Sequence, residues 1–326
     1  MPEKSGLGQL CTINNLVRTD YFSNTYRATF AVGDEETEWD IIHISLPFAP
    51  LKEKQLMARF GLEPKDLEAY YSDFGRCVKN LIATANHLDD MEVTSVLPLA
   101  TYAIEKKDNA RGSDIYLVTS PLSKFSIWDD ESETSLSQIV ALGTRLCQII
   151  KGLNDVDDHM GIIDLDTTYS LHAHERDFTI LGGFLYSSRD DGKSGVKLPS
   201  VVPAHCHPVL QEGEKASLAT DVYSICSLLW SLLDGRHYTT APDASKPPQF
   251  AEQELTDVLA RGINEDNVYL SAAEMTDIVR AINKELHRYL KWLSSEAGKD
   301  ADIIIKMALP TYDLSSANAA FRNQNT

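Results

Sequence analysis

One apolar segment limits, more than any other feature, what this chain can fold into. Residues Asp221 to Leu233 read DVYSICSLLWSLL, and Gly235 follows shortly after. A segment that is apolar on all sides is expected to form a buried helix, and a glycine just past its end is a common stop signal. By ordinary helix chemistry Asp221 would be the N-cap of that helix. We therefore expect a large domain with this helix in its core.

The first third of the chain is expected to be rich in strands. Between Thr12 and about Val118, β-branched and aromatic residues favour strands, and a polar turn at Gly33 to Glu36 predicts a hairpin. Apolar residues at three- and four-residue spacing predict one helix from Leu51 to Leu88. The expected strands are Asn24 to Val32, Trp39 to Ser45, Val96 to Ile104 and Asp114 to Thr119.

The remainder of the chain is expected to be mostly helical. Two short strand-like segments are predicted at Gly161 to Ile163 and Phe178 to Leu181. Strands followed by helices predict an α+β fold. The expected helices are Ser135 to Leu153, Asp221 to Leu233, about Gln253 to Gly262, Ser271 to Ser294 and Asp302 to Leu309.

The chain is strongly acidic. Its 326 residues include 48 aspartates and glutamates against 30 lysines and arginines, which gives a net charge of −18. Nucleic acids and anionic membranes are bound through cations that displace the counterions of phosphates, so neither is an expected partner. The acidic excess either keeps the protein soluble or favours a protein partner with a basic face. The oligomeric state is not predicted.

Cysteine usage and the N-terminal residues favour a cytoplasmic protein. Met1 to Gln9 lacks a basic stretch followed by an apolar run, and the apolar segments are too short to span a bilayer. The cysteines show no short repeated spacing, which is typical neither of a disulfide framework nor of a zinc ribbon. They are Cys11, Cys77, Cys147, Cys206 and Cys226.

Four segments, in this order along the chain, resemble the eukaryotic-type protein-kinase family. Asp114 to Ser126 is similar to the last strand and hinge of its first lobe. Gly161-Ile162-Ile163 follows a helix where kinases carry G-I-x-H-R-D. Asp221-Val222-Tyr223-Ser224, with the leucines after it, resembles the D-V-Y-S helix, and Ser271 to Met275 resembles S-A-x-E-L.

This resemblance implies a two-lobed protein-kinase-like fold. Residues 1–119 would form a β-rich N-lobe with one long helix, residues 120–126 a hinge, residues 127–311 a mostly helical C-lobe, and residues 312–326 a polar tail. It also implies that Asp221 is buried and accepts hydrogen bonds from the backbone near Asp164 to Asp166, because an unpaired buried carboxylate would be costly.

The positions that match the phosphate site of kinases depart from the family pattern. The glycine-rich loop, which lets bare backbone approach the phosphates, matches a segment with Arg18, Asp20 and Ser23 in the glycine positions. Side chains there obstruct that approach. The phosphate-binding lysine matches Ile42, or His43 if the register slips by one, and its glutamate partner is missing.

The positions that match the metal-binding residues are also changed. The H-R-D-x-x-x-x-N pattern matches Asp164 to Leu171, which keeps the catalytic aspartate as Asp166 and replaces the asparagine by Leu171. D-F-G matches Gly182-Gly183-Phe184, so no carboxylate stands at the principal magnesium position. Asp164 and Asp166 could form a carboxylate pair for acid–base chemistry, although a turn aspartate is the favoured interpretation.

A buried ion pair of kinases is replaced as well. The A-P-E segment matches His207-Pro208-Val209, and Tyr269 stands where the arginine partner of the glutamate would be. Both charged partners are therefore absent, and we expect apolar packing in their place.

Two further groups of residues have ordinary explanations. Tyr289 and Trp292 on a late helix are expected to be core residues, or anchors for a partner if they prove exposed. A zinc site needs four converging ligands, and the histidines and cysteine of two loops are instead interpreted as exposed loop residues. They are His172, His174, His205, Cys206 and His207.

The sequence thus predicts a pseudokinase, a degenerate protein-kinase-like domain that binds a protein as a scaffold or regulatory module. No cofactor and no metal are expected. Two alternatives remain open. One is an atypical ATP-dependent phosphotransferase or nucleotidylyltransferase that uses Asp166 with Asp190 or Asp191. The other is a pseudokinase that binds nucleotide without turnover.

Overall fold

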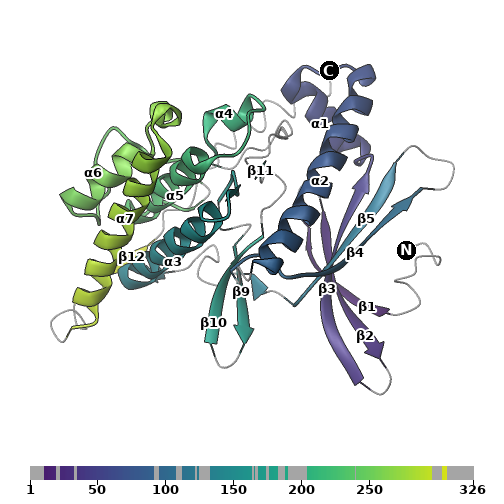
Figure 1. Cartoon of the computed structure of the whole chain (residues 1–326), viewed down its shortest axis with the longest axis horizontal. Coiled ribbons are helices and arrows are strands. Elements are labelled where there is room, and N and C mark those ends of the chain that lie inside the picture. The colour runs from purple at the N-terminus through teal and green to yellow at the C-terminus, as the bar shows by residue number, and fades with distance from the viewer. Residues whose placement is uncertain are drawn as a thin grey trace.

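A strand-rich part and a helical part lie side by side (Figure 1). In Figure 1 the sheet lies on the right, the helical part on the left, and a small hairpin between them. The computed structural model describes residues 11–19, 23–32, 35–91, 95–107, 112–121, 123–124, 133–163, 165, 168–173, 176–182, 188–189, 204–238, 240–295 and 303–306.

The strand-rich part is a five-stranded antiparallel sheet with strand order β1-β2-β3-β5-β4. β2 and β3 form the predicted hairpin, in which Val32 pairs with Glu35. The strands are β1 (Cys11–Thr19), β2 (Asn24–Val32), β3 (Glu35–Leu46), β4 (Leu99–Lys106) and β5 (Ser113–Thr119).

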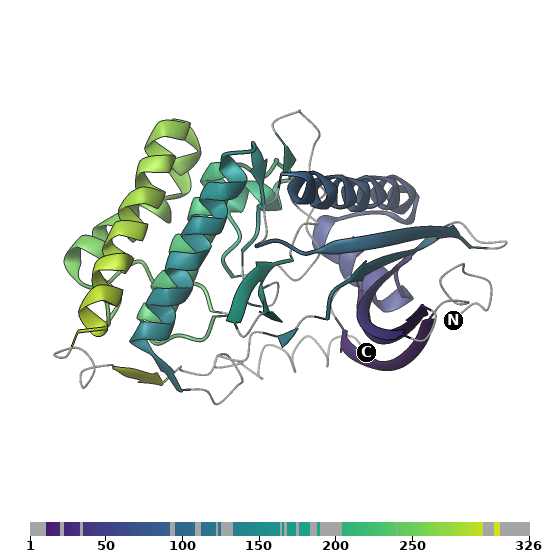
Figure 2. The same ribbon diagram turned by 60° about the horizontal axis from the view of Figure 1, so that its bottom comes forward.

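Two helices, α1 (Pro50–Phe60) and α2 (Leu67–Asp90), stand where the sequence predicted one. The prediction of a continuous helix is therefore wrong. Gly61 ends α1 with a left-handed φ of 59°, which costs glycine little, and a short 3₁₀ helix, η1 (Pro64–Asp66), precedes α2. α2 lies along one face of the sheet (Figure 2). Its buried face packs into a core shared with β3 and β5.

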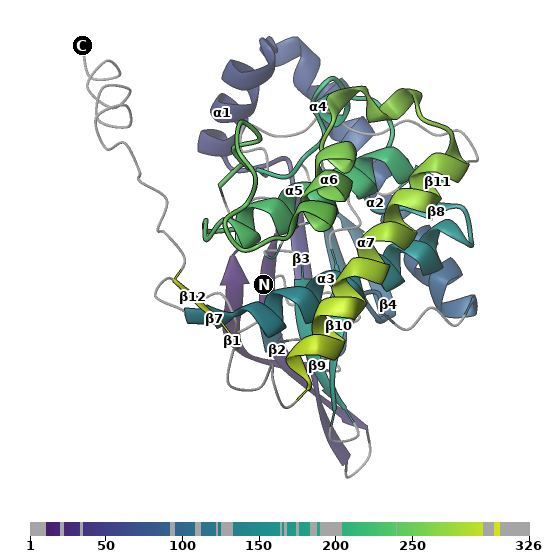
Figure 3. The same cartoon turned by 90° about the vertical axis from the view of Figure 1, so that its left-hand side faces the viewer.

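Four helices form the rest of the main core, close to their predicted bounds. α3 and α7 pack against each other and against α5, which is buried at every residue except Tyr223 (Figure 3). Ser217 caps α5 through a capping box, so the N-cap interpretation of Asp221 is wrong. The helices are α3 (Leu136–Asn154), α5 (Leu218–Leu233), α6 (Gln253–Gly262) and α7 (Ala272–Leu293).

Short elements connect these helices. β6 (Ser123–Lys124), β9 (Thr168–Ala173) and β10 (Arg176–Leu181) form an antiparallel sheet. β8 (Asp158–His159) pairs with β11 (Ser188–Arg189), and β7 (Glu133–Ser135) pairs with β12 (Ile304–Lys306). α4 (Pro208–Gln211) and the 3₁₀ helix η5 (Glu265–Tyr269) are short helical turns.

Two further predicted elements differ from the structure. Gly161 to Ile163 is not a strand, because Gly161 turns the chain with a φ of 83°. The predicted helix from Asp302 to Leu309 is also wrong, because its described residues include β12, whose isoleucines favour strand pairing with β7. The predicted α+β class is confirmed. None of the described helices is long and apolar enough to cross a membrane.

Candidate functional site

Asp221 ties the buried helix α5 to the turn that follows β8. The carboxylate is 0% exposed, as predicted. Its Oδ2 accepts a hydrogen bond from the Met160 N–H at 3.1 Å, and its Oδ1 accepts one from the Gly161 N–H at 2.7 Å. Burial raises the pKa of Asp221 to about 6, while the nearby His159 and the two backbone bonds act against that rise.

The turn held by Asp221 leads directly toward the predicted catalytic loop. Ile162, Ile163 and Leu165 are buried and fix the path of this segment. Asp164 and Asp166 lie outside the described residues. Asp221 therefore positions the backbone immediately before them, which is the kind of contact that the resemblance implied.

The sheet distinguishes the two candidates for the lysine position. Ile42 lies on the face of β3 that packs against the α2 core. His43 lies on the opposite face, where its ring stacks on Tyr116 at 4.8 Å and its Nε2 lies 2.9 Å from Asp114 Oδ1. Only Ile42 thus faces α2. Among the buried residues of α2 there is no carboxylate that could have paired with a lysine there.

A cation does stand near Ile42, but carboxylates already hold it. Arg27 on β2 pairs across the sheet with Asp40, and its Nε lies 2.5 Å from Asp40 Oδ1. Its NH1 lies 3.8 Å from Glu38. Asp40 is 2% exposed and shares the face of β3 that carries Ile42. The bond to Asp40 raises the pKa of Arg27, so the guanidinium stays charged.

The β9–β10 hairpin does not bring Leu171 and Gly182 together. Thr168 pairs with Leu181, directly before Gly182, whereas Leu171 pairs with Phe178. Leu171 therefore lies three residues along the strand, roughly 10 Å away. The two residues are separated because β9 begins only two residues after Asp166, so that Leu171 lies within the strand rather than at its start.

Gly182 lies where the two parts of the chain meet. The Leu97 N–H donates to the Leu181 carbonyl at 2.9 Å, and the Leu181 N–H donates to the Ser95 carbonyl at 3.0 Å. These bonds join the end of β10 to the segment between α2 and β4. Gly182 follows at once, half-buried and without a side chain that could bind a metal.

Two of the three residues at the glycine positions flank the β1–β2 connection. Arg18 lies in β1, where it pairs with Thr25, and Ser23 directly precedes β2. Asp20 lies outside the described residues. Arg18 and Ser23 place side chains where the resemblance implied bare backbone.

Two histidines that the sequence indicated as exposed are buried, so that prediction is wrong. His205 is 0% exposed, and its Nε2–H donates to the Tyr238 carbonyl at 2.6 Å. Its Nδ1 therefore accepts from the Ser227 hydroxyl at 2.7 Å, because a ring nitrogen must be left as the acceptor. Burial lowers the pKa of His205 to about 4, so the ring is neutral at pH 7.

His207 forms a second buried network. Its Nε2–H donates to Asn267 Oδ1 at 3.0 Å, and its Nδ1 accepts from the Val209 N–H at 3.2 Å. Asn267 Nδ2 in turn donates to the Gly262 carbonyl at 2.8 Å.

The expected apolar packing around Tyr269 is wrong, because Tyr269 is 86% exposed. No sequence motif marks Asn267, whose role depends on long-range contacts.

The remaining residues weighed as a zinc site do not change this picture. Cys206, also expected to be exposed, is buried beside the two histidines, and His174 lies outside the described residues. Within the part of the chain that the structure describes, no three His, Cys, Asp or Glu residues gather as a metal site would require. Tyr289 is buried with its hydroxyl accepting from the Glu252 N–H, whereas Trp292 is 47% exposed.

Comparison with known proteins identifies no relative from which the role of these residues could be inferred. No protein-family model matches the chain, and no curated protein matches it.

Proposed function

We propose that the chain is a protein-kinase-like domain that has lost phosphotransfer and works by binding another protein, as a scaffold or regulatory module. The observation that carries the proposal is the place of Ile42. This side chain lies on the face of β3 covered by α2, at the position that the resemblance gives to the phosphate-binding lysine. An apolar side chain cannot neutralise the charge of a transferring phosphoryl group.

The order of the elements supports the two-lobed part of the proposal. An antiparallel sheet with α2 comes first, followed by α3, the turn bound by Asp221, the β9–β10 hairpin and the buried α5. In this proposal residues 1–119 are the N-lobe, residues 120–126 the hinge and residues 127–311 the C-lobe. The hydrogen bonds from Met160 and Gly161 to Asp221 are the tertiary contact that favours this arrangement most.

The surroundings of Ile42 and Gly182 support the loss of activity. Arg27, a cation on the same face as Ile42, is bound by Asp40 and Glu38 and so is engaged before any phosphate arrives. Gly182 offers no side-chain ligand atom, and the β9 residue nearest to it, Thr168, carries a hydroxyl rather than a carboxylate or amide. Magnesium prefers carboxylate oxygens in such sites.

We expect no binding of magnesium-ATP. Titration calorimetry at millimolar nucleotide should give only the heat of dilution, and ATP with magnesium or manganese should leave the melting temperature unchanged. A ligand that binds only the folded state raises that temperature. A micromolar dissociation constant would contradict the proposal. Binding followed by turnover would favour the phosphotransferase alternative, and binding without turnover would favour a nucleotide-binding pseudokinase.

The charge of the chain favours a partner with a basic face. The net charge is −18, and the β2–β3 hairpin presents the exposed carboxylates Glu35, Glu36 and Glu38. Opposite charges on two proteins attract each other over a long range, and added salt shortens this range. Complementary charge therefore mainly raises the rate at which the two proteins associate.

Once a partner is recovered by co-purification from the native host, its association should respond strongly to salt. We expect the association rate constant to fall roughly tenfold between low and physiological ionic strength, with little change in the dissociation rate constant. Stopped-flow or surface-binding kinetics across a salt series would measure both constants. An association rate constant that does not depend on salt would refute the proposal of a basic partner. The acidic residues would then be explained by solubility alone.

A further inference from the structure

The outer face of α7 carries a row of basic side chains on a chain whose net charge is −18. Successive members of the row are three or four residues apart, so they lie one above another along one side of the helix. The opposite side of α7 is buried against α3, α5 and α6, and α7 lies at the front of the molecule in Figure 3. The row consists of the exposed residues Arg280, Lys284, His287 and Lys291.

Two charges of this row are not balanced by a neighbouring carboxylate. Arg280 is already paired with a carboxylate one turn earlier in α7. The only carboxylate in the last three turns of α7 is Glu285, which lies 2.9 Å from Arg288 Nε. Within the part of the chain that the structure describes, Lys284 and Lys291 form no ion pair. These two lysines therefore give a local positive excess that a partner can use.

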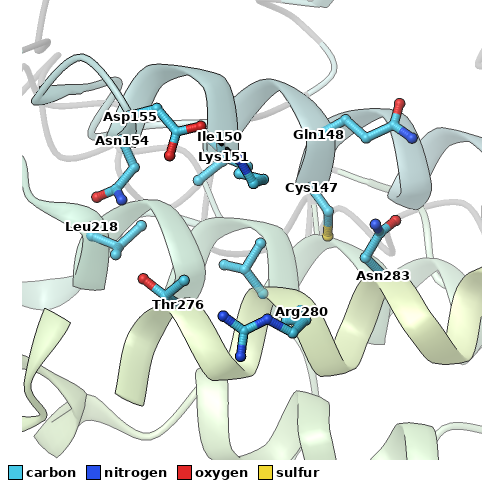
Figure 4. A pocket seen from close by; sticks show the side chains of 11 residues that line it. Cys147, Gln148, Ile150, Lys151, Asn154, Asp155, Leu218, Thr276, Arg280 and Asn283 are labelled. Carbon is cyan, nitrogen blue, oxygen red and sulfur yellow. Dashed lines mark hydrogen bonds and ion pairs between the residues drawn. The ribbon is translucent and has the colours of Figure 1, made fainter. Parts of the chain in front are cut away.

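The side of α7 that faces α3 is not open to a partner. There α7 contributes Thr276 and Asn283 to a pocket whose other wall is α3 (Figure 4). Cys147, which also lines this pocket, is 0% exposed, so the pocket is a gap in the packing of two helices. Lys284 and Lys291 do not line it. A partner that contacts both lysines must therefore approach the outer face of α7.

An exposed tryptophan stands at the C-terminal end of the row. Trp292 follows Lys291 directly and is 47% exposed, whereas Tyr289, in the same turn, is buried. Tryptophan is enriched among the residues that supply most of the binding energy at protein interfaces. The row thus ends beside an apolar side chain that a partner can cover.

We infer that the outer face of α7 docks an acidic linear segment of a partner protein. Carboxylates of this segment pair with Lys284 and Lys291, and an apolar side chain that follows them packs on Trp292. Lys284 and Trp292 are eight residues apart, which is about 12 Å along the helix axis. An extended chain rises about 3.3 Å per residue, so about four or five residues of the partner span this distance.

Salt screening favours a short acidic segment over a larger polyanion. At an ionic strength of 0.1 M, surface charges act over about 10 Å. A short segment on α7 therefore interacts mainly with the two lysines. Nucleic acid or an anionic membrane would also meet the surrounding surface of a chain with a net charge of −18. The site is separate from the acidic β2–β3 hairpin and does not depend on the loss of phosphotransfer.

The test compares two fluorescein-labelled peptides that differ only in charge. One has five glutamates followed by a leucine, and the other has five glutamines in their place. Each is titrated with the full chain in 0.1 M salt and followed by fluorescence anisotropy. We expect a submillimolar dissociation constant for the glutamate peptide and binding at least about fivefold weaker for the glutamine peptide, because the glutamine peptide lacks charged acceptors.

Three outcomes would overturn the inference. The first is no binding of the glutamate peptide at 1 mM protein, and the second is equal binding of both peptides. The third is sedimentation of the protein with phosphatidylserine vesicles when the glutamate peptide does not bind, because the face would then serve a lipid surface.

Matched charge reversals locate the site. Lys284→Glu combined with Lys291→Glu should weaken binding of the glutamate peptide about tenfold. Lys54→Glu combined with Lys79→Glu makes the same change in net charge at exposed lysines of α1 and α2, and should change the affinity less than about twofold. Melting curves would check that both double variants are folded. An equal loss in the two would show attraction to the chain as a whole and would refute the site.

Replacing Trp292 by alanine tests the apolar contact. Trp292→Ala should weaken the glutamate peptide that ends in leucine about threefold to fivefold, and should not affect a peptide that ends in serine instead. Leu51→Ala, at an exposed leucine of α1, is the control and should affect neither peptide. An equal effect of Trp292→Ala on both peptides would refute the contact with Trp292.

Discussion

Replacing Asp221 by alanine is expected to lower the free energy of unfolding by about 3 kcal/mol. The change leaves the N–H groups of Met160 and Gly161 without their acceptor in a fully buried place, and each such group costs about 1–3 kcal/mol. Relief of the buried charge offsets part of this loss, since burial raises the pKa of Asp221 to about 6. Chemical denaturation at pH 7 would measure the difference.

An exposed aspartate provides the control for this change. Among the residues that the structure describes, Asp257 on α6 bonds only to Gln253, one turn before it, and its removal should change stability by less than about 0.5 kcal/mol. A loss in Asp221→Ala no larger than that in Asp257→Ala would show that Asp221 does not hold the turn before Asp164.

The Asp221 carboxylate should also make the stability of the protein depend on pH. Its pKa in the folded state lies above the ordinary aspartate value of 3.8, so between about pH 4 and pH 6 the folded protein binds the proton and the unfolded chain does not. The stabilisation from this group is fully present below pH 4 and is lost as the pH rises through 6. Over that window the loss amounts to about 3 kcal/mol.

Asp221→Asn isolates this contribution, because asparagine does not titrate. The stability advantage of the wild type over Asp221→Asn should be larger at pH 4 than at pH 7. Carboxylates whose pKa is lowered, such as Asp114, act in the opposite direction and are shared by both proteins, so they cancel in the comparison. A difference between the two proteins that does not depend on pH would show that the pKa of Asp221 is not raised.

Replacing Gly262 by alanine is expected to destabilise the fold by about 3 kcal/mol. A Cβ at this position would lie 2.1 Å from Cys226 Sγ and 2.9 Å from Cys226 Cβ, and Cys226 is itself fully buried in α5. The Cβ of Cys226 cannot rotate away, so α5 and α6 must separate. Thermal and denaturant unfolding would measure the loss.

A matched glycine and a double variant test the cause. A Cβ at Gly152 on α3 meets nothing within 4 Å, so Gly152→Ala should stabilise the protein by about 0.5–1 kcal/mol through helix propensity. In a Cys226→Ala background, which removes Sγ, Gly262→Ala should cost about 1–2 kcal/mol less than in the wild type. Additive effects of the two changes would refute a steric contact between these positions.

Much of the helical core could be predicted from single segments. The apolar residues of α5, the stripe of α3 and the serine caps each act within one or two helical turns, so their signals survive in the bare sequence. The β2–β3 hairpin was equally local, because its turn lies between two β-branched runs. The break between α1 and α2 was local too, and Gly61 with Pro64 could have revealed it.

Other features depended on contacts between distant segments. Ile42 and His43 are adjacent and both suit a strand, and only the pairing of β3 with β5 under α2 decides which of them faces the helix. The separation of Leu171 from Gly182 follows from the register of the β9–β10 hairpin, which a count of residues from Asp166 did not reveal. In a strand, a shift of one residue changes the face of every side chain.

By itself the sequence determined which segments are apolar enough to be buried and where the main helices of the core lie, since both follow from residue type and local period. The tertiary structure alone decided where polar side chains find their partners. His205 and Asn267 look like loop residues until α5 and the end of α6 surround them. A buried polar group is stable only with a partner, and that partner is usually far away in the chain.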